Sequence, residues 1–251
     1  MKNLPEVLFV EANGTYTESL IPNDPSYQYQ WYLNNQAYPG HDIHAQSAWD
    51  IFTGNPSSII AIIDDGVDIT QTDLSAKITG GDNTFFVEHD GSLLLSHGTA
   101  VAGAAAASTN NGTSIAGVDW NARILPEDTH DYNICFCLNF ITKPHGWNLL
   151  TKKTLAAIDF NSNVWTLNHS YELSKGFLGT NYSVPLGEAF AYAAKNNRVS
   201  CVASGNDNSS STYIYPANYG SELIDVGATD QLDHRTSFSN YGANLDVVAP
   251  G

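Results

Sequence analysis

The sequence predicts one α/β domain built on a mostly parallel sheet. Apolar runs that are too short for helices alternate with segments of helical character along most of its 251 residues. The run 59–63 is apolar throughout, which is typical of a strand buried on both faces. Strands that alternate with helices favour parallel pairing, with helices on both faces of the sheet. A chain of this length can bury roughly 70–75% of its unfolded surface in a single core.

Each element follows from a local pattern. The strand 58–63 ends in two carboxylates and a glycine, 64–66. His97 begins an alanine-rich stretch through Ala107, which predicts a helix. The other predicted strands are 123–125, 164–168, 198–203, 223–227 and 245–248, and the other predicted helices are 150–160 and 186–197. The stretch 127–148 breaks the alternation with a proline, a glycine and two cysteines, so we expect a surface excursion there.

Composition restricts the partners that the chain can bind. The formal net charge is −16, with only 10 Lys and Arg residues. Nucleic acids and anionic lipids are held by basic patches, so we expect neither as a partner. The sequence has no run of about 18 apolar residues to cross a membrane, and residues 1–20 lack the apolar core of a signal peptide. Cys201 lies in an apolar strand and is expected to act as a small buried hydrophobe.

Three motifs occur in a fixed order: AIIDDGVD at 61–68, HGTAVAG at 97–103 and ASGN at 203–206. Together with PNDP at 22–25 and VAPG at 248–251, they resemble the subtilisin-like serine peptidases, or subtilases. The resemblance covers roughly residues 21–251. It implies a three-layer subtilisin-like fold with a mostly parallel central sheet, and serine endopeptidase activity.

The resemblance also implies roles for single residues. Amide hydrolysis needs a hydroxyl nucleophile, an imidazole that takes its proton, a carboxylate that orients the imidazole, and donors for the oxyanion. By family position His97 is the general base, Asp64 its carboxylate and Asn206 the oxyanion donor. Asp65 stands where many subtilases have serine or threonine. Taken singly, the carboxylates after the strand and Asn206 are also consistent with ordinary turn residues.

A substrate cleft is also implied. The segment after the strand 164–168 is similar to the subtilase strand that pairs with the substrate backbone, and the ASGN segment is similar to the facing pocket wall. The substrate-binding residues implied are Asn168, Ser170, Tyr171, Glu172, Ala203, Ser204 and Gly205. The family usually has glycine in place of Glu172. Its carboxylate either favours basic substrate side chains or narrows the cleft, or it is a solvated surface charge; both interpretations stay open.

The resemblance further implies a structural Ca²⁺ site. Calcium takes several oxygen ligands from carboxylates, amides and backbone carbonyls. The positions that match the family site are Asp24, Asp73, Asn111, Thr113 and Ile115, the last two through backbone carbonyls. The alternative is that these are turn and cap residues without a metal.

Both ends of the chain differ from a complete subtilase. The family carries its nucleophile in a Gly-Thr-Ser turn after VAPG, so the sequence resembles a subtilase truncated before the catalytic serine, with the C-terminal part of the fold missing. Residues 1–20 resemble the end of an inhibitory propeptide, or form a polar arm, and 21–251 are the expected peptidase domain. The expected partners are polypeptide substrates and the chain's own propeptide, and the expected location is secreted or at the cell surface.

Two functions follow. The first is a serine endopeptidase whose Asp-His-Ser triad is completed beyond residue 251. The second is a truncated or pseudo-peptidase that binds peptides without cleaving them. A serine turn downstream of Gly251 would separate the two.

Overall fold

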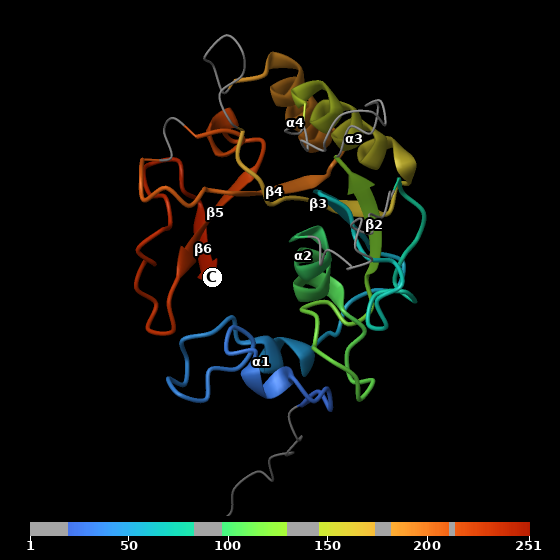
Figure 1. Ribbon diagram of the computed structural model, residues 1–251, viewed down its shortest axis with the longest axis vertical. Coiled ribbons are helices and arrows are strands. Elements are labelled where there is room, and N and C mark those ends of the chain that lie inside the picture. Colours follow the sequence, from blue (N-terminus) through green and yellow to red (C-terminus); the bar gives the residue numbers. More distant parts are fainter. Residues whose placement is uncertain (1–19, 83–96, 130–145, 174–181, 211–213) are drawn as a thin grey trace, which may run out of the picture.

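The structure, a computed structural model, describes residues 20–82, 97–129, 146–173, 182–210 and 214–251 (Figure 1). The predicted propeptide end and most of the predicted excursion, with Cys135 and Cys137, lie outside these ranges.

Within these described ranges, six strands form one sheet in the order β2-β1-β3-β4-β5-β6, and every neighbouring pair is parallel. The strands are β1 (Ile59–Asp64), β2 (Arg123–Asp128), β3 (Val164–His169), β4 (Val199–Ala203), β5 (Ile224–Thr229) and β6 (Val247–Pro250). Because all six run the same way, their carboxyl ends share one edge of the sheet. In open α/β sheets this edge is where ligands bind.

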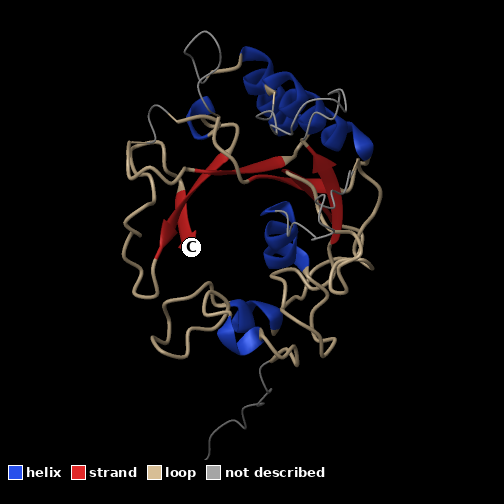
Figure 2. Ribbon diagram, viewed as in Figure 1, coloured by secondary structure: helices blue, strands red, loops and turns tan. Residues whose placement is uncertain are grey.

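Helices cover both faces of the sheet, as the sequence predicts. The helices are α1 (Ala45–Trp49), α2 (His97–Ala106), α3 (Trp147–Phe160) and α4 (Val184–Lys195), with short 3₁₀ turns at η1 (Tyr27–Tyr29) and η3 (Ala217–Tyr219). Helices α3 and α4 lie side by side on one face, and α2 lies on the other (Figures 1 and 2). The α/β class with a mostly parallel sheet is therefore confirmed.

The alternation of side chains along β1 supplies both cores. Ala61 and Ile63 pack with Phe190 and other residues under α3 and α4, whereas Ile62 packs with Ala102 and Ala106 of α2. Successive strand residues point to opposite faces, so an uninterrupted apolar run is what a strand covered on both sides requires.

The predicted excursion at 127–148 is wrong at both ends. Strand β2 continues through Glu127 and Asp128, which are 4% and 2% exposed. Helix α3 already begins at Trp147. The prediction rested on a proline, a glycine and two cysteines further along the segment. The carboxylate of Glu127 can be buried because Lys153 Nζ of α3 lies 3.6 Å from one of its oxygens. Burial still raises the pKa of Glu127 to about 7, against the lowering effect of Lys153.

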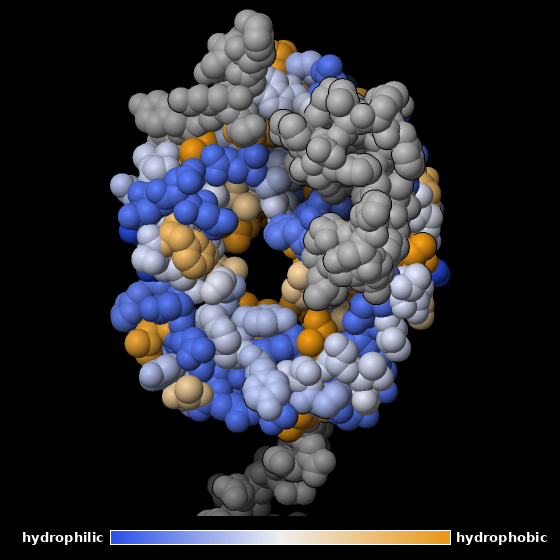
Figure 3. All heavy atoms as spheres, in the orientation of Figure 1, coloured by the Kyte–Doolittle hydropathy of each residue, from blue (hydrophilic) through white to orange (hydrophobic). Residues whose placement is uncertain are grey.

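The α2 face of the sheet is only half covered by described residues. Over β1 and β2 the apolar side chains are buried beneath α2. Over β3 to β6, Cys201 and Val226 are half-buried and Val247 is 49% exposed. Figure 3 shows a hollow in the middle of the molecule where this surface lies. Cys201 is therefore more exposed than the sequence predicts, because it faces this uncovered half.

None of the helices in the described ranges has the length and apolar character needed to cross a membrane.

Candidate active site

The side chains of Asp64 and His97 are in hydrogen-bonding contact at the carboxyl edge of the sheet. The imidazole Nδ1 of His97 lies 2.9 Å from Asp64 Oδ1 and 3.0 Å from Oδ2. The Asp64 side chain is 6% exposed and that of His97 is 57% exposed. One ring nitrogen is therefore held by a buried carboxylate, while the other ring nitrogen, Nε2, has no partner among the described residues.

The backbone and carboxylate of Asp64 are held by the residues that directly follow β2 and β1. Thr129 donates both its N–H and its hydroxyl to the Asp64 carbonyl oxygen, at 2.9 and 2.8 Å. The Asp65 N–H donates to Asp64 Oδ1 at 2.8 Å. The carboxylate thus reaches His97 from a rigid strand end rather than from a free loop.

Gly98 allows α2 to begin against this strand end. A Cβ at Gly98 would lie 2.3 Å from the Gly66 carbonyl oxygen and 2.9 Å from Asp64 Cβ, distances that real Cβ atoms do not reach. The glycine after the histidine is therefore required by packing. It lets the helix that carries His97 approach Asp64 closely enough for the contact between their side chains.

The contact with Asp64 changes the acidity of His97. The pKa of His97 is raised, first by the hydrogen bond to Asp64 and further by the charges of Asp64 and Asp65, while burial acts in the opposite direction. An imidazole that is both oriented and made more basic can accept a proton from a hydroxyl placed at Nε2.

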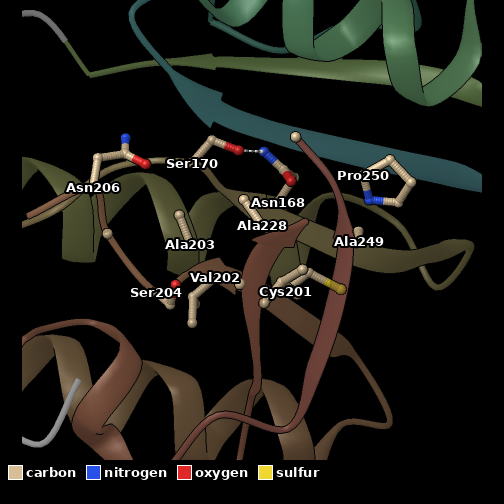
Figure 4. Close-up of a pocket in the computed structure, with 14 residues that line it drawn as sticks. Asn168, Ser170, Cys201, Val202, Ala203, Ser204, Asn206, Ala228, Ala249 and Pro250 are labelled. Carbon is tan, nitrogen blue, oxygen red and sulfur yellow. Dashed lines mark hydrogen bonds between the residues drawn. The ribbon is translucent and has the colours of Figure 1, made fainter. Parts of the chain in front are cut away.

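A pocket of about 340 Å³ lies at the same edge, over the uncovered half of the sheet. Residues from the ends of β3, β4, β5 and β6 line it, as the close-up in Figure 4 shows. Six of the predicted residues are among its lining: Asn168, Ser170, Ala203, Ser204, Gly205 and Asn206. The structure thus gathers residues that are widely separated in sequence, and Cys201 also reaches this pocket.

A single buried side chain holds the loop that carries Asn206. Asn240 is fully buried; its Nδ2 donates to the Ser204 carbonyl oxygen at 2.8 Å, and its Oδ1 accepts from the N–H groups of Asp207 and Ser209 at 3.0 and 2.9 Å. Gly205 is needed in this loop because its φ is +100° and a Cβ would lie 2.3 Å from Asn240 Nδ2. The sequence prediction missed Asn240, whose partners lie more than 30 residues away in the chain.

The two other predicted substrate residues are not in the pocket lining. Tyr171 packs against the core under α3 and α4, and its hydroxyl lies 2.8 Å from His169 Nδ1. Glu172 is exposed, beside the Gly205 turn. Its pKa is raised by partial burial and by the nearby Asp207 carboxylate. Any role of Tyr171 toward a substrate would thus be through its backbone, whereas Glu172 could act through its charge.

The residues predicted for Ca²⁺ come together around the loop 110–115, which follows the C-terminal end of α2. Asp24 accepts from the N–H groups of Asn110 and Asn111, at 2.7 and 3.3 Å. Asp73 accepts from Asn111 Nδ2 at 3.0 Å and from the Ile115 N–H at 3.1 Å. The Thr113 N–H donates to Asn111 Oδ1 at 2.8 Å.

The chemistry of this cluster fits a hard cation. Asp24 and Asp73 are 4% and 1% exposed, and within the described ranges no Lys, Arg or His forms an ion pair with either of them. Buried carboxylates without a counter-charge are costly, and a cation would remove that cost. No group of three or more His, Cys, Asp or Glu side chains suited to a metal occurs in the described residues. The ligands here would be two carboxylates together with amide and carbonyl oxygens.

Comparisons with known proteins identify the family of the chain. Residues 56–251 match the profile of the subtilase family. The chain is 37% identical over its whole length to a thermophilic serine proteinase of Bacillus sp. strain AK1, of which it covers 56%. It is 36% identical to thermitase of Thermoactinomyces vulgaris, over 92% of this chain and 73% of that protein. It is also 31% identical, over all of its length, to a cell wall-associated protease of Bacillus subtilis, of which it covers only 26%.

A solved structure of proteases from Pseudoalteromonas arctica superimposes on the chain with a TM-score of 0.71 at 28% identity, covering 92% of this chain and 72% of that one. The chain spans about half the length of the Bacillus sp. strain AK1 proteinase. With a family match over 56–251 and relatives above 30% identity across nearly all of its residues, the chain belongs to the subtilase family.

Proposed function

We propose that this chain is the larger part of a serine endopeptidase domain that hydrolyses peptide bonds through an Asp-His-Ser triad. The observation that carries the proposal is the contact of His97 Nδ1 with both oxygens of the buried Asp64 carboxylate. This contact fixes the tautomer that leaves Nε2 able to accept a proton.

In this mechanism His97 Nε2 takes the proton of a serine hydroxyl as the oxygen attacks the substrate carbonyl carbon, and then delivers it to the leaving amine. Asp64 stabilises the imidazolium that forms between the two steps. The Asn206 amide donates a hydrogen bond to the carbonyl oxygen as negative charge develops on it. Asn206 is exposed at the pocket rim, on a loop that Asn240 holds in place, which supports this role.

The nucleophile is proposed to lie beyond residue 251. Within the described residues, no serine or threonine hydroxyl contacts the His97 ring. The hollow over β3 to β6, with its half-exposed apolar side chains, is a surface that a further helix carrying the serine could cover. This reasoning favours a peptidase over a peptide-binding pseudo-enzyme.

The test compares the 251-residue chain with the same chain extended through the following Gly-Thr-Ser segment. Each is treated with a fluorophosphonate probe that labels activated serines and is then given a generic protein substrate. We expect labelling and cleavage only with the extended protein. Stoichiometric labelling of the shorter chain would show that another residue is the nucleophile, and an extended protein that folds but is never labelled would favour the pseudo-peptidase.

We also propose that Ca²⁺ binds Asp24, Asp73, Asn111 and the carbonyls of Thr113 and Ile115. The support is the burial of two carboxylates beside that loop, which accept hydrogen bonds there but form no ion pair with a Lys, Arg or His of the described residues. The ion would stabilise the fold and take no part in the chemistry.

The proposed substrates are polypeptides, and the propeptide of the same chain is a proposed inhibitory partner. A secreted or cell-surface location is proposed because one relative is described as a cell wall-associated protease.

A further inference from the structure

The Asp65 carboxylate lies across the start of α2. Its Oδ2 accepts the His97 N–H at 3.0 Å and its Oδ1 accepts the Gly98 N–H at 2.7 Å. The first N–H groups of a helix have no acceptor within the helix, and this end of the helix also carries a partial positive charge. A carboxylate from the end of β1 therefore satisfies two of these groups and adds a full negative charge at the same place.

Adjacent residues of one strand end thus hold His97 twice. Asp64 contacts the ring, and Asp65 contacts the main chain of the same residue. Since the two carboxylates are fixed by one backbone, a change in the position of α2 relative to β1 would disturb both contacts together.

We propose that Asp65 is a positioning residue for His97: it fixes the beginning of α2 so that the imidazole meets Asp64, and it places a second negative charge beside the ring. This inference rests on the proposed peptidase function, in which His97 is the general base.

The charges around His97 come from several elements. Helix α2 has no ionisable residue other than His97. Asp64 and Asp65 face it from β1. The buried Asp128 is the partner of Asp64 on β2. Tyr171 follows β3, and its pKa is raised mainly by burial, with smaller contributions from Tyr219 and Asp64. Asp68 lies in the loop that contacts α2, with its N–H donating to Thr99 Oγ1.

The sign of the effect follows from the pKa of His97, which Asp64 raises most and Asp65 raises further. Removing the Asp65 charge lowers that pKa, so the ring becomes neutral at lower pH. A general base acts when neutral, so the acidic limb of the pH–rate profile moves to lower pH.

The first test follows the His97 ring in the 251-residue chain by NMR titration, with its signal assigned from the spectrum of His97→Ala. Asp65→Asn and Asp65→Ser both remove the charge, and serine can still cap the helix with one oxygen. We expect the pKa of His97 to fall in both variants. Asp68→Asn is the matched control, because the Asp68 carboxylate accepts hydrogen bonds from Thr70 and not from His97. In this variant His97 should titrate as in the wild type. Wild-type titration in both Asp65 variants would overturn the proposal.

The second test measures peptide hydrolysis by the protein extended through its serine segment. We expect Asp65→Ala to lower kcat by about 10–100-fold through misplacement of the ring, with KM nearly unchanged. Asp65→Ser should recover part of kcat while its acidic limb stays at lower pH. If Asp65→Ala does not fold, the serine and asparagine variants decide.

Asp64→Asn separates the two levels of inference. A normal His97 titration in Asp64→Asn, with no probe labelling of the extended wild type, would remove the peptidase proposal itself. A lowered pKa of His97 in Asp64→Asn, together with wild-type titration of His97 in the Asp65 variants, would remove only the role of Asp65.

Discussion

The two halves of the sheet face that carries α2 differ in how well the described residues cover them. Over β1 and β2, α2 closes an apolar core and presses His97 against Asp64. Over β3 to β6, the same face stays half-exposed and holds the pocket with Asn206 at its rim. In the proposed peptidase, proton transfer would therefore be organised by a packed junction of strand and helix, whereas substrate binding and oxyanion stabilisation would depend on loops at the edge of a surface that the described residues leave half-exposed.

The largest loss of activity is expected from a change in the covered half, over β1 and β2. Asp64→Asn should lower kcat of the extended protein by about 10⁴-fold, the loss known when the triad carboxylate of another serine peptidase is replaced in this way. The amide keeps the shape but favours the wrong tautomer of His97. Steady-state kinetics with a peptide substrate measures the change, and a loss below tenfold would show that the strand–helix junction does not organise the proton transfer.

The open half should give the next largest effect. Asn206→Ala is expected to lower kcat by about 10²–10³-fold, the range known for one oxyanion donor in a subtilisin, and to leave KM nearly unchanged. A matched change is Asn208→Ala on the same loop, whose side chain accepts from Arg235 instead, at 2.9 Å. An effect confined to KM would take Asn206 out of the oxyanion role.

Calcium should act through the region beside α2. At a concentration 100 times the dissociation constant, Ca²⁺ is expected to add about 2.7 kcal/mol to the free energy of unfolding. Asp73→Ala should abolish the increase, and thermal melting with calcium or with a chelator measures it. Asp119, which accepts from the N–H groups of Asn121 and Ala122 and contacts none of the proposed calcium ligands, serves as the control, so Asp119→Ala should keep the response. If calcium does not raise the melting temperature of the wild type, the proposed calcium site is wrong.

Glu172 at the rim of the open half is expected to have the smallest effect. Its carboxylate lies near that of Asp207, and the paired negative charge should favour substrates with a basic side chain. Glu172→Gln should reduce the preference for Lys or Arg over Leu by about tenfold or less, since solvent screens an exposed charge. Competition between matched peptides measures this ratio. An unchanged ratio would leave Glu172 as a solvated surface charge.

The fold and the Asp64–His97 contact could be predicted because their signals are local. An apolar run predicts a strand, a glycine after His97 allows close packing, and family order relates the two. Buried polar residues with distant partners could not be predicted in this way. The burial of Glu127 depends on Lys153, which comes from a distant helix. The local sequence around Asn240 likewise does not indicate that its side chain holds the loop of Asn206.

Asp225 is a buried carboxylate that the local sequence pattern does not predict. It lies in the predicted strand 223–227 and is fully buried, with neither carboxylate oxygen paired within the described residues. Burial, with a smaller effect from Asp246, raises its pKa to about 6. No sequence pattern announces a carboxylate in that position, because its energy depends on neighbours that the strand meets only after folding.

The Asn240 clamp also sets an order of assembly. Asp64, His97 and the elements that join them are all present once the first 129 residues have been synthesised. The loop of Asn206 is held by a side chain that leaves the ribosome more than 30 residues later. The contact between Asp64 and His97 can therefore form early in biosynthesis, whereas the loop of Asn206 is held in place only after Asn240 has been synthesised.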